Sequence, residues 1–291
     1  MKLVSVGELT IDHYRNLNRS FVGGISFNFA VQAKRCGAEE VSLVSRIGSD
    51  ANGTSALARL SAERVDASRV AVLPGKTATC TIELIDGLER SYPSGGYHQN
   101  VLAGFELTAA DGAFIQKHDV IVSHLDYSQS PALFNQTMVA LDFHGKRIAD
   151  FGDWSDYHGD HDTLIAYLDR LDIAFVSGTQ AAIDRLLPVS RQVGSLIVVT
   201  LGAGGSAALY EGQLWFQPAL AAPVLLDTTG CGDAFQAAFT VSYLRTGGIE
   251  QALASGAQQA AVTIQHHGAT GREILTAEHA AGASPVDEQK R

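Results

Sequence analysis

Short apolar runs rich in β-branched residues alternate with helical patterns along most of this chain, and this alternation limits the possible folds more than any other feature. The run at 41–48 precedes a helical pattern at 54–65, and the run at 119–124 precedes another near 131–143. Repeated strand–helix units build parallel sheets, since each helix carries the chain back to the same edge. Further runs, whose unbroken apolar character suits strands covered on both faces, lie at 147–151, 172–177, 195–202 and 223–228. The sequence therefore predicts an α/β fold with a doubly wound, mainly parallel sheet and helices on both faces.

Residues 77–85 depart from this pattern because apolar and polar side chains alternate there, as in a strand with one covered face. Asp86-Gly87 then supplies a hairpin turn, and the irregular segment at 12–22 is the expected companion. We predict a small β-sheet lid over the carboxyl edge of the main sheet, built from about 12–22 and 76–95. An apolar lid face that one chain leaves uncovered would be costly to expose, so we expect a homodimer in which two lids pair.

Composition and charge limit the partners of the protein. The chain has 291 residues, of which 46% are hydrophobic and 18% charged, and its net charge is -10. We expect one α/β domain over 1–291 with a disordered polar tail from about 277 to 291. The acidic charge disfavours nucleic acid and membrane surfaces as partners.

No apolar run approaches the roughly 18 residues that a membrane span needs, and the first residues enter a strand pattern at once. We therefore expect a cytoplasmic protein. Its three cysteines, Cys36, Cys80 and Cys231, are widely separated and are expected to be reduced thiols.

The stretch LLDTTGCGDAF at 225–235 runs from an apolar segment into an apolar helix. Gly230, Cys231 and Gly232 fall at the turn, where unpaired N–H groups and the helix dipole favour an anion. Asp233 in the first helical turn has two interpretations: an acid that complements the dipole, or a base that takes the proton of a hydroxyl attacking a phosphoryl group. The local pattern leaves both open. A thiol at a helix N-terminus tends to a lowered pKa, so we expect Cys231 to be reactive.

Three other motifs have ordinary explanations. The glycines at 201–205 fail as a dinucleotide fingerprint, because a strand pattern follows where that fold needs a helix. PGKT at 74–77 fails as a P-loop, because Val70 stands where the first glycine is required. DWSDYHGDHD at 153–162 carries two histidines among carboxylates, and a metal site there is the minor alternative to a solvated loop. That loop follows the run at 147–151, at the sheet edge where ligands bind.

Four motifs in order resemble the signatures of the ribokinase-like (PfkB) carbohydrate kinases. They are GEL followed by Asp12, FVGGISFNFAVQAKRCG at 21–37, VTLGAGGSAALY at 199–210, and DTTGCGDAF at 227–235. The motifs span almost the whole chain, and together they are far more specific than any one alone. The resemblance implies a central sheet with helices on both faces and a β lid, and an ATP-dependent sugar kinase that uses Mg²⁺.

The resemblance also implies roles for individual residues. It makes Asp233 the catalytic base and forms the anion hole from Gly230, Cys231 and Gly232. The residues that it places on the sugar hydroxyls are Asp12, Gly24 and Asn28. Those that it places along the nucleotide are Thr200, Gly202 and Gly205. Asp227 and Thr229 match family positions beside a potassium site.

The chain departs from the family after the run at 172–177. The family commonly has an Asn there and a Glu three residues on, which organise magnesium and phosphates, whereas this chain has Ser177 and Gln180. A neutral Gln cannot supply the same charge, so the magnesium ligands stay unassigned.

Within the family, DFGDW at 150–154 and TIQHHGA at 263–269 are most similar to fructosamine kinases. The expected reaction transfers the γ-phosphoryl of ATP to a primary hydroxyl of a ketose or a fructoselysine-like ketose-amine. Two alternatives are a nucleoside kinase of the same fold and a catalytically silent sugar-binding regulatory paralogue. The retained Asp233 argues against the second, because binding alone needs no base.

Overall fold

A computed structural model describes residues 1–125, 130–158 and 160–274 of the chain. Its centre is a nine-stranded sheet with the order β14-β13-β12-β11-β10-β9-β1-β4-β5. The strand pairs from β5 to β12 are parallel, and β13 and β14 add two antiparallel pairs at one edge. The strands are β1 (Lys2–Val6), β4 (Glu40–Gly48), β5 (Asp66–Leu73), β9 (Val120–His124), β10 (Lys146–Asp153), β11 (Ile173–Ser177), β12 (Leu196–Thr200), β13 (Ser206–Tyr210) and β14 (Gln213–Gln217).

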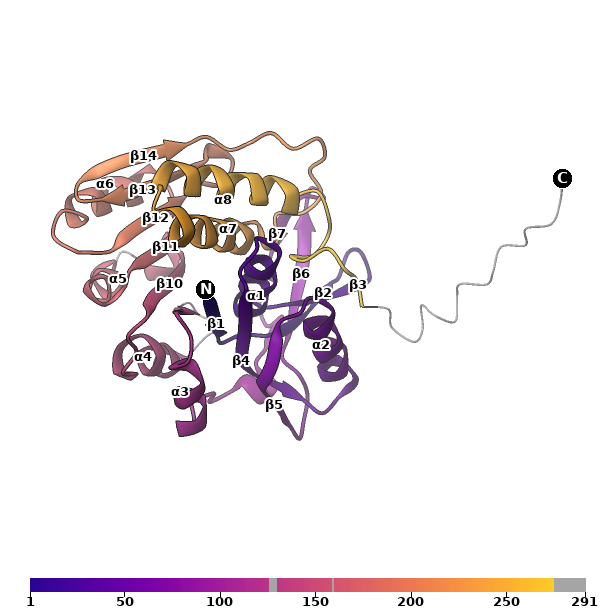
Figure 1. The fold of residues 1–291 in the computed structure, drawn as a ribbon. Helices are drawn as coiled ribbons and strands as arrows, with labels where there is room; N and C mark the ends of the chain where they lie inside the picture. The colour runs from indigo at the N-terminus through magenta and orange to yellow at the C-terminus, as the bar shows by residue number, and fades with distance from the viewer. Residues whose placement is uncertain (126–129, 159, 275–291) are drawn as a thin grey trace.

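Helices cover both faces of this sheet (Figure 1), as predicted for a doubly wound fold. One face packs against α1 (Ile25–Arg35), α2 (Ala51–Ala62), α7 (Cys231–Thr246) and α8 (Ile249–Thr263). The other face packs against α3 (Ala109–Ile115), α4 (Pro131–Asn135), α5 (Asp162–Ile165) and α6 (Gln180–Val189). Neighbouring strand residues such as Leu3 and Val4 belong to opposite cores. This explains the unbroken apolar runs, because both faces of each strand are covered.

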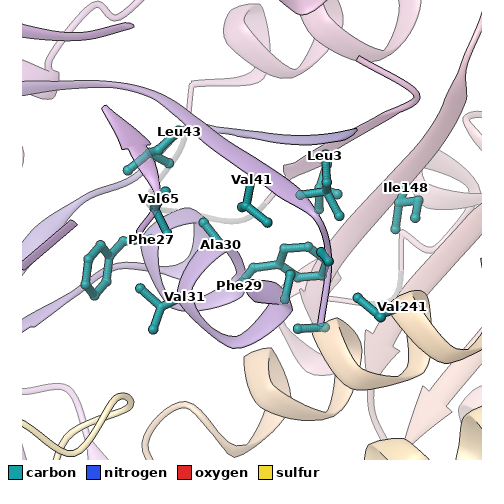
Figure 2. Close-up of a cluster of buried hydrophobic side chains, with 14 of the residues drawn as sticks. Leu3, Phe27, Phe29, Ala30, Val31, Val41, Leu43, Val65, Ile148 and Val241 are labelled. Carbon is teal, nitrogen blue, oxygen red and sulfur yellow. The ribbon is translucent and has the colours of Figure 1, made fainter. Parts of the chain in front are cut away.

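The core between α1 and the main sheet holds the first turn of α1 in place. Figure 2 shows Phe27, Ala30 and Val31 of α1 beside Val41 and Leu43 of β4. These side chains are at most 2% exposed. Burying a side chain of this size contributes roughly 1.5–3 kcal/mol. The packing fixes α1 against the sheet, and with it the polar residues at its first turn.

A second sheet of five strands lies apart from the first, and we call it the lid. Its strands are β2 (Thr10–Tyr14), β3 (Arg19–Gly23), β6 (Thr79–Ile85), β7 (Glu89–Ser91) and β8 (Tyr97–His98). The alternating segment at 77–85 forms β6, and Cys80, Ile82 and Leu84 pack on Tyr14 and Phe21. The apolar face of β6 is therefore covered within one chain. The expected reason for a homodimer through the lid was wrong, and the dimer stays a prediction without that support.

The segment 223–228 is not a strand, contrary to its apolar composition. Val224 and Leu225 are about half exposed, at 49% and 53%. The backbone N–H groups of Leu226 and Asp227 donate to Ile264 O at the end of α8 instead of joining a ladder. The hairpin β13–β14 takes the sheet edge, so this segment crosses the sheet end as a loop that leads into α7.

Within the described ranges, no helix is long and apolar enough to cross a membrane. The predicted tail at 277–291 lies outside the described residues.

Candidate active site

A cleft of about 360 Å³ lies between the lid and the strand ends of the main sheet. Its lining comes from the loop after β1, the lid, the first turn of α1, the ends of β10 and β11, and the N-terminus of α7. The sequence-predicted residues in the lining are Asp12, Gly24, Asn28, Thr229, Gly230, Gly232 and Asp233. The fold thus gathers residues from both ends of the chain at one place. This is the edge of an open α/β sheet where ligands bind.

Asp233 lies in the first turn of α7 and faces α1. The Asn28 Nδ2 group donates a hydrogen bond to Asp233 Oδ2 at 2.8 Å. Burial, and then the negative charge of Asp150, raise the pKa of Asp233 to about 8, although Asn28 and Arg90 act in the opposite direction. A carboxylate that only complemented a helix dipole would be stabilised in its charged form. The raised pKa therefore favours a group adapted to exchange a proton.

Asp12 is another carboxyl in the cleft, and it is buried, with 5% of its surface exposed. Thr10 Oγ1 donates to Asp12 Oδ1 at 2.8 Å. Burial raises the pKa of Asp12 to about 7, and the carboxylates of Glu8 and Asp227 add to the effect. A Cβ atom at Gly23 would lie 1.9 Å from Asp12 Oδ2. Gly23, the first of the two glycines before α1, therefore makes room for the Asp12 side chain.

Gly24, the second of these glycines, is the N-cap of α1. Gly24 has φ 96°, and a Cβ atom there would lie 2.9 Å from Glu8 O. The Gly24 carbonyl accepts the N–H of Asn28 at 2.8 Å, and Glu8 Oε2 accepts the N–H of Ile25 at 3.2 Å. Asn28 is 4% exposed, and among the described residues its Oδ1 atom has no hydrogen-bond partner. The turn thus presents a buried amide oxygen that is available to a ligand hydroxyl.

The turn before α7 is held by Asp227, which is fully buried. Its carboxylate accepts hydrogen bonds from Tyr14 OH at 2.7 Å, from the Thr229 N–H at 2.8 Å and from the Gly268 N–H at 2.8 Å. Three donors on one carboxylate fix the turn against the lid and the segment after α8. This anchoring uses both oxygens of Asp227, while the potassium site at Asp227 and Thr229 stays a prediction.

Gly230 and Gly232 have different structural environments. Gly230 has φ 77°, and a Cβ atom there would lie 2.2 Å from the Cβ of Ala269. A Cβ atom at Gly232 would meet nothing within 4 Å. No described residue accepts a hydrogen bond from the backbone N–H of Gly232 or Asp233. These donors at the positive end of α7 suit an anion such as a phosphoryl group.

Cys231 does not behave as expected from its position. Its thiol is directed to the carbonyl oxygens of Asp227 and Ala260, at 3.9 and 3.8 Å, and it is absent from the lining of the cleft. Burial raises the pKa of Cys231 to about 12. The predicted lowering was wrong, because a thiolate here would face carbonyl oxygens rather than N–H groups. The Cys231 N–H also donates to Thr228 O at 3.2 Å.

None of the predicted nucleotide residues lines the cleft, but Thr200 contacts a residue that does. Its Oγ1 atom is 2.9 Å from Ser177 Oγ, and Ser177 lines the cleft. Gly202 and Gly205 lie outside the lining and shape the turn between β12 and β13, with φ of 56° and 104°. A Cβ atom at Gly205 would lie 2.3 Å from Gln217 O. Their contact with a nucleotide remains a prediction.

The positions after β11 are not arranged to bind a metal. Gln180 is exposed and donates to Asp184 Oδ1 of its own helix at 2.9 Å. In the polar loop at 153–162, the ring of His161 stacks on Trp154 with centroids 3.6 Å apart. No group of three His, Cys, Asp or Glu residues within the described part of the chain could hold a metal ion. The hypothesis of a histidine metal site in this loop is therefore not supported.

Several further lining residues were not predicted as site residues, although Asp153 and Asp156 belong to the loop at 153–162 that the sequence placed at this sheet edge. The further residues are Glu8, Ile25, Cys80, Ile82, Glu89, Arg90, Tyr92, Tyr97, Asp150, Gly152, Asp153, Asp156, Ser177, Gln236 and Thr10. Asp150 had a usable signal, because it lies near the carboxyl end of β10, where ligands bind in such sheets. Arg90 had no such signal, because the alternating pattern of a hairpin does not reveal which of its side chains reaches the cleft.

Comparison with known proteins places this chain in a family. The chain is 33% identical over 273 residues to fructoselysine 6-kinase of Escherichia coli (strain K12), which covers 92% of this chain and 98% of that protein. It is 28% identical over 282 residues to a fructosamine kinase of Bacillus subtilis (strain 168), covering 93% of each.

Solved structures share the fold at lower identity. A ribokinase of Arabidopsis thaliana complexed with ribose and ATP superposes with a TM-score of 0.75 at 21% identity, covering 92% of this chain and 94% of that one. An adenosine kinase of Sinorhizobium meliloti superposes with a TM-score of 0.79 at 17% identity, covering 97% and 98%. The family model described as pfkB family carbohydrate kinase matches residues 1–275. The chain therefore belongs to the pfkB family of carbohydrate kinases and is a phosphotransferase.

Proposed function

We propose that this protein transfers the γ-phosphoryl of ATP to a primary hydroxyl of a ketose-amine, with Asp233 as the base. The observation that carries the proposal is the pairing of Asp233 with Asn28 in the cleft, 2.8 Å apart, at the N-terminus of α7. Asp12 lies on the lid side of the same cleft, and we assign it to a sugar hydroxyl. The site thus offers a proton acceptor, a hydroxyl-binding carboxyl and an anion-binding helix end.

At the γ-phosphorus, the reaction forms one bond and breaks one bond. The hydroxyl oxygen of the sugar forms a bond to the γ-phosphorus, and the bond from that phosphorus to the β–γ bridging oxygen breaks. ADP leaves with that oxygen, and the hydroxyl proton moves to Asp233. The N–H groups of Gly232 and Asp233 hold the transferred group at the positive end of α7. Positioning and charge stabilisation supply most of the rate in such transfers.

ATP and Mg²⁺ fit the residues present. The open face above Gly232 leaves space for phosphates, and Asp150 and Asp153 supply oxygen atoms of the kind that magnesium prefers. Magnesium commonly keeps several waters and takes only one or two protein carboxylates. When bound, it would neutralise charge on the β- and γ-phosphates.

The charge of the cleft favours an amine over a neutral ketose. Its lining holds one arginine and seven carboxyl side chains, which are Glu8, Asp12, Glu89, Asp150, Asp153, Asp156 and Asp233. Such a lining attracts a substrate that carries an ammonium group. The similarity to fructoselysine 6-kinase and to a fructosamine kinase supports the same choice. A nucleoside carries no such charge, which makes a nucleoside kinase the weaker alternative.

Turnover of ATP with a matched pair of acceptors tests this proposal. One acceptor is a ketose-amine with a secondary amine, and the other is its N-acetyl derivative, which keeps the sugar but has no positive charge. We expect kcat/KM to be about 10–100-fold lower for the N-acetyl compound, as for the loss of one charge pair in a low-dielectric cleft. Fructose, ribose and adenosine complete the panel. Equal values for the matched pair, or a preference for adenosine, would contradict the proposed substrate class.

The two raised pKa values predict an acid-side loss of activity. Asp233 must be deprotonated to accept a proton, and its pKa is about 8, so kcat/KM should fall as pH decreases below about 8. Asp12, with a pKa of about 7, adds a second protonation below that value. The profile should be measured with a neutral ketose, whose own charge is constant. Asp12→Asn should leave a single protonation step, whereas a flat profile between pH 6 and 9 would rule out the assignment of the base.

A further inference from the structure

Arg90 is the only positively charged side chain among the described residues that line the cleft. It belongs to β7, the short lid strand that pairs with β6, and its cross-strand partner is Leu84. Directly opposed residues of an antiparallel pair project from the same face, and Leu84 is buried in the apolar cluster of the lid. The strand register therefore places the Arg90 guanidinium on the same face of the lid as Leu84, where its side chain lines the cleft and is 37% exposed.

The lid is joined to the turn before α7 through Thr228. The Thr228 N–H donates to Leu88 O at 3.1 Å, and the Arg90 N–H donates to Thr228 Oγ1 at 3.1 Å. Arg90 Nη1 donates to Thr228 O at 3.3 Å, and Thr228 Oγ1 donates to Glu89 Oε1 at 3.0 Å. Thr228 precedes Gly230 by two residues. These bonds hold the lid strand in a fixed position beside the anion-binding turn.

Arg90 retains donor capacity after these contacts. Its Nε atom donates to Tyr92 OH at 3.2 Å, and Nη1 is used by Thr228 O. No described residue accepts a hydrogen bond from Nη2. Tyr92, and to a smaller extent Glu89 and Asp233, raise the pKa of Arg90, so the guanidinium stays charged at all working pH values. A charged planar fork with a free donor is the group best suited to bind a phosphoryl oxygen.

The remaining charges of the cleft favour such a cation. Seven carboxyl side chains line the cleft, and the phosphates of ATP add further negative charge at the N-terminus of α7. Gln180 supplies no charge after β11 and is turned along its own helix. A side-chain cation beside the phosphoryl group offsets this repulsion where it is strongest.

We propose that Arg90 binds the transferred phosphoryl group and stabilises the negative charge that develops while its bond to ADP breaks. Arg90 thus acts as a catalytic residue on the lid side, opposite Asp233, and it exchanges no proton. The hydroxyl proton still moves to Asp233. The inference rests on the proposed function, because it needs ATP as the donor. Cations in this role raise kcat by about 10³–10⁵-fold in other phosphoryl-transfer enzymes.

Three substitutions test the role by kinetics. Arg90→Gln is expected to lower kcat by about 10²–10³-fold with KM for the sugar within about threefold, and Arg90→Lys to recover part of the loss. Arg15→Gln is the matched control, since Arg15 is a lid arginine with 62% exposure that pairs with Glu83. It should keep the parent rate. An Arg90→Gln variant with kcat within twofold of the parent would overturn the proposal, as would one with a raised KM for the sugar and an unchanged kcat.

Two further measurements exclude a purely structural role. Free guanidinium should restore part of kcat to Arg90→Ala, which a folding defect would not allow. Calorimetry should show that Arg90→Gln weakens binding of a non-hydrolysable ATP analogue much more than binding of ADP. Equal weakening of both nucleotides, or no rescue, would contradict contact with the γ-phosphoryl. If the parent phosphorylates no sugar, the proposed function fails, and the nucleotide comparison still decides the role of Arg90.

Discussion

Replacing Gly230 with alanine is expected to lower the free energy of unfolding by about 2–5 kcal/mol and to lower kcat by at least about 10²-fold. Gly230 has φ 77°, and alanine in the left-handed region costs roughly 1–2 kcal/mol. The added Cβ would also lie 2.2 Å from the Cβ of Ala269, so the turn or the segment after α8 must move. Such overpacking typically costs about 1–3 kcal/mol. A displacement near 1 Å at the N-terminus of α7 would misplace the anion site and the base together.

The same helix provides a control for this prediction. Gly247, at the C-terminus of α7, has φ 71°, but a Cβ atom there meets nothing within 4 Å. Gly247→Ala therefore carries the backbone cost without the collision, and it should lose only about 1–2 kcal/mol. Thermal unfolding of both variants separates the cost of the backbone conformation from the cost of the collision with Ala269. If Gly230→Ala unfolds at the same temperature as Gly247→Ala and keeps its activity, the contact with Ala269 does not position the turn.

The fold was predictable where local pattern and burial agree. The runs that became β11 and β12 are apolar on both faces, and both faces are covered by helices in the structure. The segment at 223–228 has similar composition but lies in a loop, with Leu225 exposed. The apolar content of a segment does not show whether the sheet has a free edge strand with which it can pair. The sheet edge was already occupied by β14, and that depends on the whole topology.

The sequence predicted which residues belong to the site better than it predicted where their side chains point. Asp12, Asn28 and Asp233, which the motifs singled out, all line one cleft, while their roles stay predictions. The direction of the Cys231 thiol depends on how α7 packs on α8, so the helix-end argument gave the wrong sign for its pKa. The contact of Arg90 with Thr228 joins residues far apart in the sequence, and no local pattern encodes it.

Asp233→Asn is expected to have the largest effect on the rate and to spare the fold. The amide keeps the size of the carboxyl but cannot accept the proton, and general-base contributions are typically about 10²–10⁴-fold, or roughly 3–5 kcal/mol of barrier. Affinities for ATP and sugar should change little, because the backbone donors of α7 remain. Asn28 can still donate to the new side-chain oxygen.

The effect of Asp233→Asn on the stability of the fold has a defined direction. The pKa of Asp233 rises from 3.8 to about 8, mainly by burial, so the folded state binds the proton more tightly than the unfolded state does. The stability that this proton supplies is complete below pH 3.8 and is lost as pH increases through about 8. At pH 8 and above the parent carries a partly buried carboxylate near Asp150, and the variant does not. Asp233→Asn should therefore melt at the same or a higher temperature than the parent at pH 8–9.

The most direct test of Asp233 as the base is the single-turnover rate of phosphoryl transfer for Asp233→Asn, measured at pH 8 beside its melting temperature. We expect a rate about 10²–10⁴-fold below that of the parent, with an unchanged or higher melting temperature. A variant that transfers phosphate at near the parent rate but melts several degrees lower would contradict the role of Asp233 as base, and would make Asp233 a structural acid of the α7 N-terminus.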